Sequence, residues 1–223
     1  MKSSLYIVSV PIGNDSDISA RAVEILRKSD LLIGEEFRNT AAFLKRNGVS
    51  KEFELLNEHS TFEDTEVLFR KIQSSEITSL FSDAGTPVIA DPGRDLISRC
   101  ADAGIQIKSV PGPSSVTAAL SISGLNVFPF TCAGFVSRED SVRREEIRRF
   151  LKLNHTLIFL ETPYRYKKLF HEIDSLLKTD PRCFLGLGLT SEEEIQFRGK
   201  WSELRKEIDR YPKLPPVLIL ELL

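Results

Sequence analysis

The sequence has few of the residues that several large protein classes depend on. Its 223 residues include three cysteines and three histidines, with no C-x-x-C and no H-E-x-x-H spacing. A disulfide framework is therefore excluded, and a zinc site is not indicated. The cysteines stand among apolar neighbours, which predicts buried, unreactive thiols. They are Cys100, Cys132 and Cys183.

Long hydrophobic runs are also absent. The first apolar run, residues 5–10, is too short for the core of a signal peptide. The last, residues 217–223, is far below the roughly 20 residues that a membrane helix needs. The sequence therefore predicts a cytoplasmic protein with no membrane segment. Hydrophobic residues make up 41% of the chain, enough for real cores, and 28% charged residues suit a water-exposed surface.

The common nucleotide-binding and hydrolase signatures are missing as well. There is no G-x-G-x-x-G after the first apolar run, no G-x-x-x-x-G-K-[ST] and no G-x-S-x-G. A net charge of −2 does not indicate a strongly basic nucleic-acid binder. After Gly124, 17 Lys and Arg stand against 15 Asp and Glu, so a contact with a polyanion is better placed in that half. Ordinary scatter of surface charge explains so small an excess equally well.

The first half of the chain alternates short β-type runs with helical patterns. Predicted strands cover residues 5–10, 31–33, 77–81 and 105–110. Predicted helices cover residues 20–28, 40–47, 62–73, 95–103 and 114–121. Ser19 is a plausible N-cap, Gly48 a stop signal, and Val67, Leu68 and Ile72 are expected to face inward. This order predicts an α/β domain whose mostly parallel sheet has helices on both faces.

The second half is expected to form a separate domain. Residues 124–129 combine turn residues with no periodicity, which predicts domains at residues 1–124 and 125–223. Predicted strands cover residues 130–136, 156–160, 183–189, 195–199 and 217–222. Predicted helices cover residues 142–151, 164–177 and 202–210. The excess of strands favours a mixed sheet with helices on one face.

Three polar turns follow predicted strands of the first half. They cover residues 10–19, 81–93 and 110–115. Ligands of α/β sheets bind at the carboxyl ends of parallel strands, so the three turns together indicate one shared site. Gly85 would let a ligand approach the backbone closely, and free N–H groups near Ser114 and Ser115 could hold a carboxylate or hydroxyl. Plain structural turns and a helix cap remain alternatives.

Eight stretches carry a resemblance to a known family, in the family's order over almost the whole chain. They are LYIVSVPIGN (5–14), D-I-S-x-R-A (17–22), E-x-x-R-x-T (35–40), SDAGTPVIADPG (82–93), VPGPSS (110–115), GF (134–135), TLIFLETPYR (156–165) and LTSEEEIQFRG (189–199). On these residues the chain resembles the tetrapyrrole-methylase superfamily, the class III methyltransferases that use S-adenosylmethionine. Within it, the chain is similar to the branch that methylates small-subunit ribosomal RNA.

This resemblance implies a bilobal α/β fold that holds S-adenosylmethionine between its lobes and requires no metal. It implies 2′-O-methylation of a ribose in ribosomal RNA, and a homodimer. By position it assigns cofactor contacts to two strand-end loops and to the end of a strand in the second lobe. The matching residues are Ala84, Gly85, Thr86, Ile89, Ser114, Ser115 and Glu161.

Several departures from the branch affect the substrate more than the cofactor site. The branch reads E-D-T-R-x-T, whereas this chain has Glu36 and Phe37 in the second and third places. It has leucine at the position of Asp15 and lysine at that of Ser191. It also carries a C-terminal helical extension, whereas this sequence stops at Leu223. The ETPYR stretch and LNEHS-x-x-ED at residues 56–64 indicate a shorter subgroup.

Methyl transfer from a sulfonium depends mostly on holding the acceptor in line. A ribose hydroxyl also needs a group that takes its proton, such as a carboxylate. Asp17 and Glu35 are the catalytic candidates, with Glu36 beside them and Arg38 placed to orient a phosphate. A solvated pair of Glu35 and Glu36 is an equal alternative.

RNA binding would need cations, and the second half has a cluster within residues 138–152. It comprises Arg138, Arg143, Arg144, Arg148, Arg149 and Lys152, followed by Arg165, Lys167 and Lys168. Helical spacing places Arg144 and Arg148 on one face, suited to phosphates. Interleaved Asp and Glu residues make a solvated helix with i,i+4 ion pairs the alternative.

Two rival functions remain open beside methylation of ribosomal RNA. A methyltransferase for a small cyclic or heteroaromatic molecule would show a deep, enclosed apolar cavity near the cofactor. A non-catalytic module that binds the cofactor or the ribosome would bind without turnover.

Overall fold

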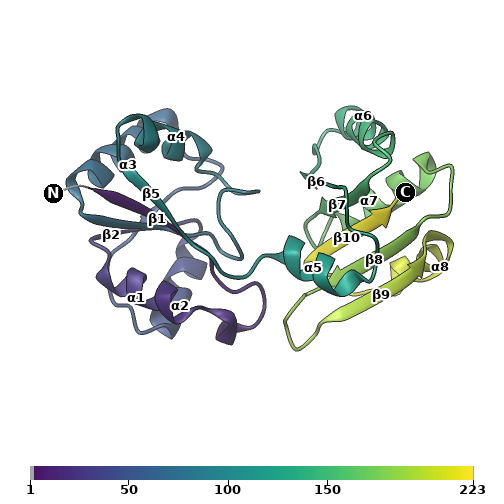
Figure 1. Cartoon of the computed structure of the whole chain (residues 1–223), viewed down its shortest axis with the longest axis horizontal. Coiled ribbons are helices and arrows are strands. Elements are labelled where there is room, and N and C mark those ends of the chain that lie inside the picture. Colours follow the sequence, from purple (N-terminus) through teal and green to yellow (C-terminus); the bar gives the residue numbers. More distant parts are fainter. Residues whose placement is uncertain (1–2, 223) are drawn as a thin grey trace. The chain divides into compact units, whose positions relative to one another are not determined.

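The computed structural model describes residues 3–222, which divide into two compact units (Figure 1). The first unit spans Met1–Ser114 and the second spans Ser115–Leu223. The predicted boundary lay after Gly124. The division instead precedes helix α5 (Ser115–Ser123), because α5 packs against strand β10 (Pro216–Glu221) of the second unit.

The first unit is built on a five-stranded parallel sheet in the order β3-β2-β4-β1-β5. The strands are β1 Ser4–Val8, β2 Leu31–Gly34, β3 Glu54–Leu55, β4 Ile77–Leu80 and β5 Gln106–Val110. The helices are α1 Ala20–Lys28, α2 Phe37–Arg46, α3 Phe62–Ser74 and α4 Arg94–Asp102. The element order and the parallel sheet confirm the predicted class.

Each face of this sheet has its own hydrophobic core. Val8 of β1 packs in a core with Leu26 of α1 and Phe43 of α2. Leu5 of the same strand packs in a second core with Leu68 of α3 and other residues of α3 and α4. Side chains of a strand alternate between faces, so two helices cover each face, α3 and α4 above and α1 and α2 below in Figure 1.

Caps explain where several helices of the first unit begin and end. The Ser19 hydroxyl accepts a hydrogen bond from Ala22 N (3.1 Å), as predicted. Helix α2 begins at Phe37, earlier than predicted, because the Glu36 carboxylate caps it. Gly48 follows α2 with φ 64°, a conformation that favours glycine. Val67, predicted to face inward, is exposed because the buried stripe of α3 runs through Leu68 and Ile72.

The second unit contains a mixed sheet in the order β6-β7-β10-β8-β9, in which β6 and β7 are parallel and the other pairs antiparallel. Its strands are β6 Phe130–Phe135, β7 Thr156–Leu160, β8 Arg182–Leu187, β9 Ile195–Lys200 and β10 Pro216–Glu221. Its helices are α5, α6 Asp140–Leu151, α7 Tyr166–Leu176 and α8 Trp201–Glu207. Short 3-10 turns occur at Asp15–Asp17 in the first unit and Ile208–Arg210 here.

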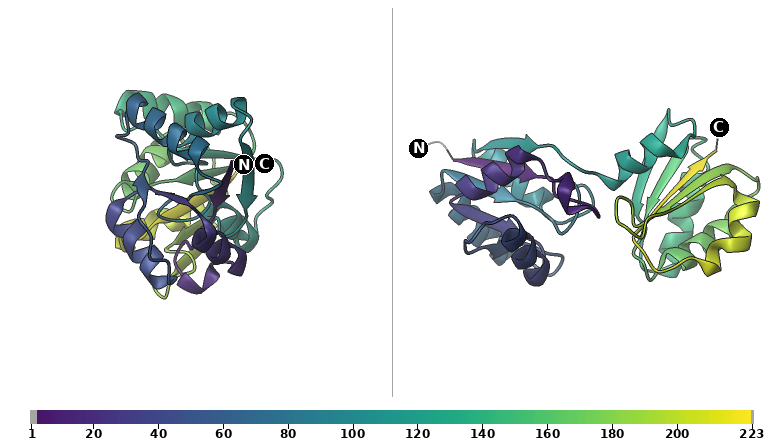
Figure 2. Two further views of the ribbon diagram at one scale, coloured as in Figure 1. Left: turned by 90° about the vertical axis from the view of Figure 1, so that its left-hand side faces the viewer. Right: turned by 90° about the horizontal axis from the view of Figure 1, so that it is seen from below.

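Helices cover both faces of this second sheet. Ile147 of α6, Phe170 of α7 and Trp201 of α8 share one core with strand residues such as Phe159. The intervening strand residues, including Ile219, are also buried, and α5 contacts β10 on that side. Figure 2 shows α5 across the sheet from α7 and α8. The predicted one-sided arrangement is therefore wrong, because α5 belongs to this unit.

Two predictions about burial and membranes can be compared with the structure. Cys100 and Cys183 are buried, and burial raises the pKa of their thiols to about 11 and about 12. Cys132 is exposed, contrary to prediction, because β6 is an edge strand. Among residues 3–222, no helix is both long enough and apolar enough to cross a membrane.

Candidate functional site

The loops that follow the parallel strands of the first unit meet at one edge of its sheet. A hydrogen-bonded backbone pair joins the first two loops, from Val10 N to Gly85 O (2.9 Å) and from Gly85 N to Val10 O (3.1 Å). Gly85 has φ 76°, which L side chains rarely adopt. Backbone hydrogen bonds thus join the loop after β1 to the loop after β4.

Side-chain hydroxyls extend this connection to the turn after β5. The oxygens of the Ser9 and Thr86 hydroxyls lie 3.0 Å apart, and the Thr86 hydroxyl donates to Pro113 O (3.1 Å). Gly112 allows close packing here, because a Cβ at that position would lie 3.0 Å from the Ser9 Cβ. The three polar turns of the sequence analysis therefore share one edge, as predicted.

The turn after β2 is attached to the same edge through Asp83. The Asp83 carboxylate accepts hydrogen bonds from Glu36 N (3.3 Å) and from Asn39 Nδ2 (2.6 Å). In return, Asp83 N donates to Glu35 Oε2 (3.2 Å). Glu36 caps α2 by accepting from Arg38 N (2.8 Å) and Asn39 N (3.1 Å). The departure from aspartate to Glu36 therefore keeps a capping carboxylate.

Two carboxylates at this edge have altered protonation behaviour. Burial raises the pKa of Glu35, opposed by the hydrogen bond from Asp83 N, and nearby carboxylates including Asp91 raise it further. Burial also raises the pKa of Asp91, and the charge of Asp83 adds to this. Groups of this kind can take up a proton, and they favour positively charged ligands.

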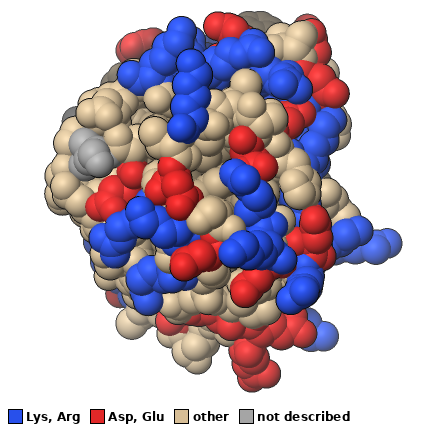
Figure 3. Space-filling model, turned by 90° about the vertical axis from the view of Figure 1, so that its right-hand side faces the viewer, with Lys and Arg blue, Asp and Glu red and all other residues tan. Residues whose placement is uncertain are grey.

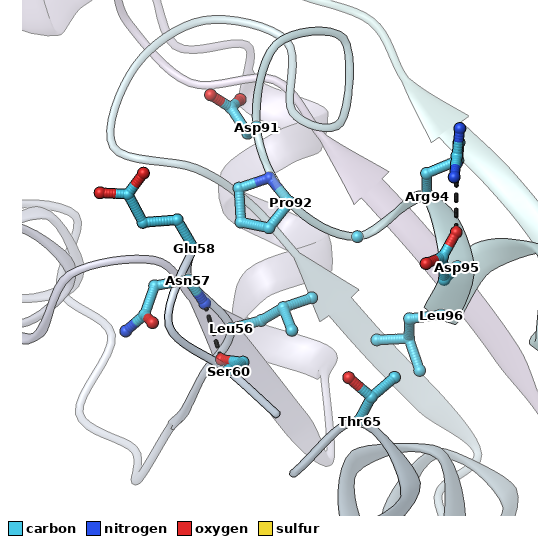
Figure 4. A pocket seen from close by; sticks show the side chains of 11 residues that line it. Leu56, Asn57, Glu58, Ser60, Thr65, Asp91, Pro92, Arg94, Asp95 and Leu96 are labelled. Atoms are coloured by element: carbon cyan, nitrogen blue, oxygen red, sulfur yellow. Dashed lines mark hydrogen bonds and ion pairs between the residues drawn. The ribbon is translucent and has the colours of Figure 1, made fainter. Parts of the chain in front are cut away.

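A pocket of about 320 Å³ opens beside these carboxylates (Figure 4). Glu58 and Asn57 line it from the loop after β3, and Asp91 lines it from the loop after β4. Arg94 and Asp95, at the start of α4, form an exposed ion pair of 3.1 Å at its side. The lining is mixed, because Leu56, Pro92 and Leu96 stand beside the carboxylates and the hydroxyls of Ser60 and Thr65.

The predicted cofactor residues of the first unit lie on these loops. Ala84 and Ile89 are exposed, Gly85 is buried, and Thr86 is half-buried. Ser114 is half-buried at the end of the turn, and Ser115 opens α5. The side chains of Ala84 and Ile89 are accessible to a ligand. Gly85 has no side chain, and its backbone N–H and C=O already bond to Val10.

The predicted catalytic residues occupy different positions around the same edge. Asp17 ends the short turn after β1 and is exposed, and Arg38 is exposed in the first turn of α2. Glu35 is half-buried and bonded to Asp83 N. Burial raises the pKa of Glu35, and its carboxylate is bonded directly to the loop after β4.

Glu161 belongs to the second unit, at the end of β7, and its side chain is 2% exposed. Its Oε1 accepts from Thr162 N (2.8 Å). Its Oε2 lies 3.2 Å from Arg165 Nη2 but accepts no well-aligned hydrogen bond. The carboxylate is therefore directed into its own unit and is not presented at the surface.

The basic cluster of the second unit separates into structural and exposed members. The Arg143 side chain is 2% exposed and makes a bidentate pair with Glu172 (2.5 and 2.6 Å). Lys168 pairs with Asp140 (2.8 Å), and Arg165 is half-buried. The exposed cations of the segment are Arg138, Arg144, Arg148, Arg149 and Lys152. In Figure 3, Lys and Arg gather along the upper rim of this face, at the height of α6 in Figure 1, with Asp and Glu among them.

Sequence reasoning gave no catalytic or cofactor role to four residues at this edge: Asn39, Glu58, Asp83 and Asp91. Asp83 and Asp91 stand in the loop that the sequence analysis singled out, and Asn39 stands in the E-x-x-R-x-T stretch. Asn39 and Asp83 bond to each other across 44 positions of the sequence, which no local pattern could indicate. Among residues 3–222, no group of three or more His, Cys, Asp or Glu side chains is arranged to hold a metal ion.

Comparison with known proteins gives close relatives. The sequence profile of the family described as Tetrapyrrole (Corrin/Porphyrin) Methylases matches residues 4–205. The chain is 47% identical to ribosomal RNA small subunit methyltransferase I of Leptospira borgpetersenii serovar Hardjo-bovis, over 99% of this chain and 88% of the relative.

Solved structures share the fold. A diphthine synthase has a TM-score of 0.75 at 20% identity, over 98% of this chain and 90% of that one. A uroporphyrin-III C-methyl transferase from Thermus thermophilus, complexed with S-adenyl homocysteine, has a TM-score of 0.66 at 16% identity, over 97% of this chain and 96% of that one.

Proposed function

The chain belongs to the tetrapyrrole (corrin/porphyrin) methylase family, and from this premise we propose that it is an S-adenosylmethionine-dependent methyltransferase that modifies small-subunit ribosomal RNA. The acceptor we propose is a ribose 2′-hydroxyl. The relative from Leptospira supports the RNA substrate through its name and through 47% identity over almost the whole chain.

The observation that carries the proposal is the hydrogen-bonded edge of the first unit. Hydrogen bonds fix three strand-end loops to one another there. A preorganised loop loses little entropy on binding, so its surface suits a defined ligand. We assign Ala84, Gly85, Thr86 and Ile89 to this cofactor seat, with Ser114 and Ser115 after the next turn. Glu161 is a weaker candidate, since its side chain is buried within its own unit and one of its oxygens already accepts from Thr162 N.

The charge of this edge fits the proposed cofactor. S-adenosylmethionine supplies an electrophilic methyl group from a positively charged sulfonium when it is bound. Glu35 and Asp91 provide negative charge beside the seat, and Gly85 and Gly112 leave room where a side chain would crowd the loops. Opposite charges attract strongly where water is partly excluded.

Glu35 is the residue we propose as proton acceptor, with Asp91 second. A 2′-hydroxyl loses its proton as its oxygen forms the new bond to carbon, and a partly buried carboxylate of raised pKa can receive that proton. The pocket beside Asp91 would hold the uncharged sugar and base of the acceptor nucleotide, with Asn57 as a hydrogen-bonding partner. Asp17 and Arg38 would line the approach, Arg38 toward a phosphate.

The RNA backbone is proposed to contact the exposed cations of α6 and its flanks, mainly Arg144 and Arg148. Each phosphate that a cation neutralises releases counterions, so binding would weaken as salt rises. We also propose a homodimer acting in the cytoplasm, consistent with the family resemblance and with a ribosomal substrate. The small-molecule rival would need an enclosed apolar cavity, whereas this pocket has three carboxylates in its lining, those of Glu58, Asp91 and Asp95.

Methyl transfer tests the proposal directly. Wild-type protein and Glu35→Gln would be incubated with radiolabelled S-adenosylmethionine and small ribosomal subunits from a strain that lacks the gene. We expect label in ribosomal RNA with wild type, at a nucleotide whose 3′-phosphodiester bond resists alkaline cleavage. Labelling with Glu35→Gln should be at least tenfold slower. Label that enters a metabolite extract and spares RNA would refute the RNA substrate.

Calorimetry tests the cofactor assignment separately from the substrate. S-adenosylhomocysteine would be titrated into folded protein, with Ile89→Asp as the variant at the exposed part of the loop. Wild type is expected to release or absorb heat with one site per chain, and the variant to bind more weakly. Turnover that is absent on every RNA and metabolite fraction, despite tight binding, would favour the non-catalytic module.

A further inference from the structure

The Thr86 hydroxyl is already engaged within the first unit. A threonine hydroxyl carries one proton, and here that proton goes to Pro113 O at 3.1 Å. The 3.0 Å contact with Ser9 must then run from the Ser9 hydroxyl to the Thr86 oxygen. The result is a directed chain from Ser9 through Thr86 to Pro113.

This chain joins loops that the sheet itself does not join. In the strand order, β1 lies between β4 and β5, so β4 and β5 share no backbone hydrogen bonds. Thr86 follows β4 and Pro113 follows β5, and their bond passes directly from one loop to the other. Ser9, which follows β1, supplies the support from the middle strand.

We propose that Ser9 and Thr86 are positioning residues that fix the spacing between the loop of residues 82–93 and the turn of residues 110–114. The family resemblance assigns Thr86 to cofactor contact, whereas the geometry gives its hydroxyl an internal role. This inference rests on the proposed function, since the spacing matters because the cofactor seat spans both loops.

Loss of the chain would leave the fold intact and loosen the seat. The backbone pair of Val10 and Gly85 still joins the loops after β1 and β4, but it should open more often without the neighbouring Ser9–Thr86 bond. The turn at Pro113 would then move relative to Gly85, and a ligand that touches both loops would have to order them on binding. One lost hydrogen bond of this kind corresponds to roughly a 2- to 12-fold weaker affinity.

A double-mutant cycle on cofactor binding is the test. Calorimetry with S-adenosylhomocysteine would compare wild type, Ser9→Ala, Thr86→Val and the double variant, with Thr86→Ser as the conservative replacement. We expect each single variant to bind about fivefold more weakly, the double variant no more weakly than Thr86→Val, and Thr86→Ser to keep wild-type affinity.

Two patterns would overturn the inference. Full affinity in Ser9→Ala with a large loss in Thr86→Val would mean that Thr86 contacts the cofactor directly. Effects that multiply in the double variant would mean that the hydroxyls act independently.

A matched control lies in the same sheet. The hydroxyls of Ser29 and Ser79 form a buried pair at 2.7 Å, with Ser79 inside β4. Ser79→Ala is expected to lower stability without changing affinity. An equal loss of affinity in Ser79→Ala would show that losing any hydroxyl pair of this sheet weakens cofactor binding. That result would overturn the positioning role of Ser9 and Thr86.

A ligand-free readout separates this inference from the proposed function. Hydrogen exchange at the amides of Val10 and Gly85 would be compared in unligated wild type, Thr86→Val and Ser79→Ala. We expect faster exchange at these amides in Thr86→Val alone. If the protein shows this exchange pattern but binds no S-adenosylhomocysteine, the proposed cofactor is refuted and the positioning role is retained. Unchanged exchange in Thr86→Val would refute the positioning role.

Discussion

Replacing Arg143 should unfold the second unit at much lower denaturant than replacing its neighbour Arg144. Sequence spacing assigned both to one basic helix, but the Arg143 side chain is 2% exposed and makes a bidentate ion pair with Glu172. Arg143 also donates to the backbone oxygens of Ser137 (3.2 Å) and Arg138 (2.9 Å). It therefore ties α6 both to α7 and to the segment after β6.

The magnitude follows from the burial of the partner. Arg143→Ala leaves Glu172 with a charge that is 13% exposed and has lost its bidentate donor. Breaking a buried pair costs about 3–5 kcal/mol, and we take about 3 because water still reaches Glu172. The contact with Asp140 adds little, since that carboxylate is 69% exposed. Arg144→Ala, on the exposed face, should stay within about 0.5 kcal/mol.

Trp201 offers an assay specific to this unit. It is the chain's one tryptophan, it is fully buried, and its ring stacks on Phe170 with centroids 4.1 Å apart. Its fluorescence in urea should report unfolding of the second unit. With a denaturant slope of about 1–3 kcal/mol per molar, Arg143→Ala should lower the midpoint by roughly 1–3 M. Equal midpoints for Arg143→Ala and Arg144→Ala would refute the reasoning.

Acidity provides an internal check on the same pair. The hydrogen bond from Arg143 holds the pKa of Glu172 below its ordinary value of 4.5. A lowered pKa in the folded state stabilises the protein above pH 4.5, and this contribution disappears as the pH falls through the folded-state pKa. The midpoint gap between wild type and Arg143→Ala should therefore narrow below pH 4.5. A midpoint gap that stays constant down to pH 2 would show that Arg143 does not stabilise the unit through the charge of Glu172.

Three further outcomes can be measured directly. Gly85→Ala, at φ 76°, should cost about 1–2 kcal/mol of backbone strain and weaken S-adenosylhomocysteine binding in calorimetry. Asp91→Asn should raise the melting temperature followed by circular dichroism at pH 7, because burial raises the pKa of Asp91 and its charged form is disfavoured; the gain should vanish below pH 3.8. Ellman's reagent should label one thiol in native protein, Cys132, and reach Cys100 and Cys183 only after unfolding.

The elements that sequence reasoning placed well are those with strong local signals. Helix α1 occupies the predicted residues because Ser19 caps it and its apolar residues recur at helical spacing. Strand β7 also has its predicted bounds, since its five consecutive buried residues stand between turns. Strand β3 was missed because two residues, Glu54 and Leu55, cannot show a period.

The misplacements come from interactions that link distant segments. Helix α5 is rich in small and apolar residues on all sides, so its sequence offers no face from which its neighbour could be inferred. Arg143 has the same helical context as Arg144, and its burial depends on Glu172, which lies on another helix. The role of Asp83 likewise depends on Asn39, in the first turn of helix α2. Local patterns predicted that three strand-end loops would meet, but not which side chains hold them together.

The central place of β10 in the second sheet has a consequence for how the protein is made. Residues 216–221 pair with both β7 and β8, so these two strands cannot join until that segment has left the ribosome. Every strand of the first sheet, in contrast, is complete by Val110. Synthesis from the N-terminus should therefore produce a finished first unit while the second still awaits its middle strand, exposing apolar strand surface that a nascent-chain chaperone could shield.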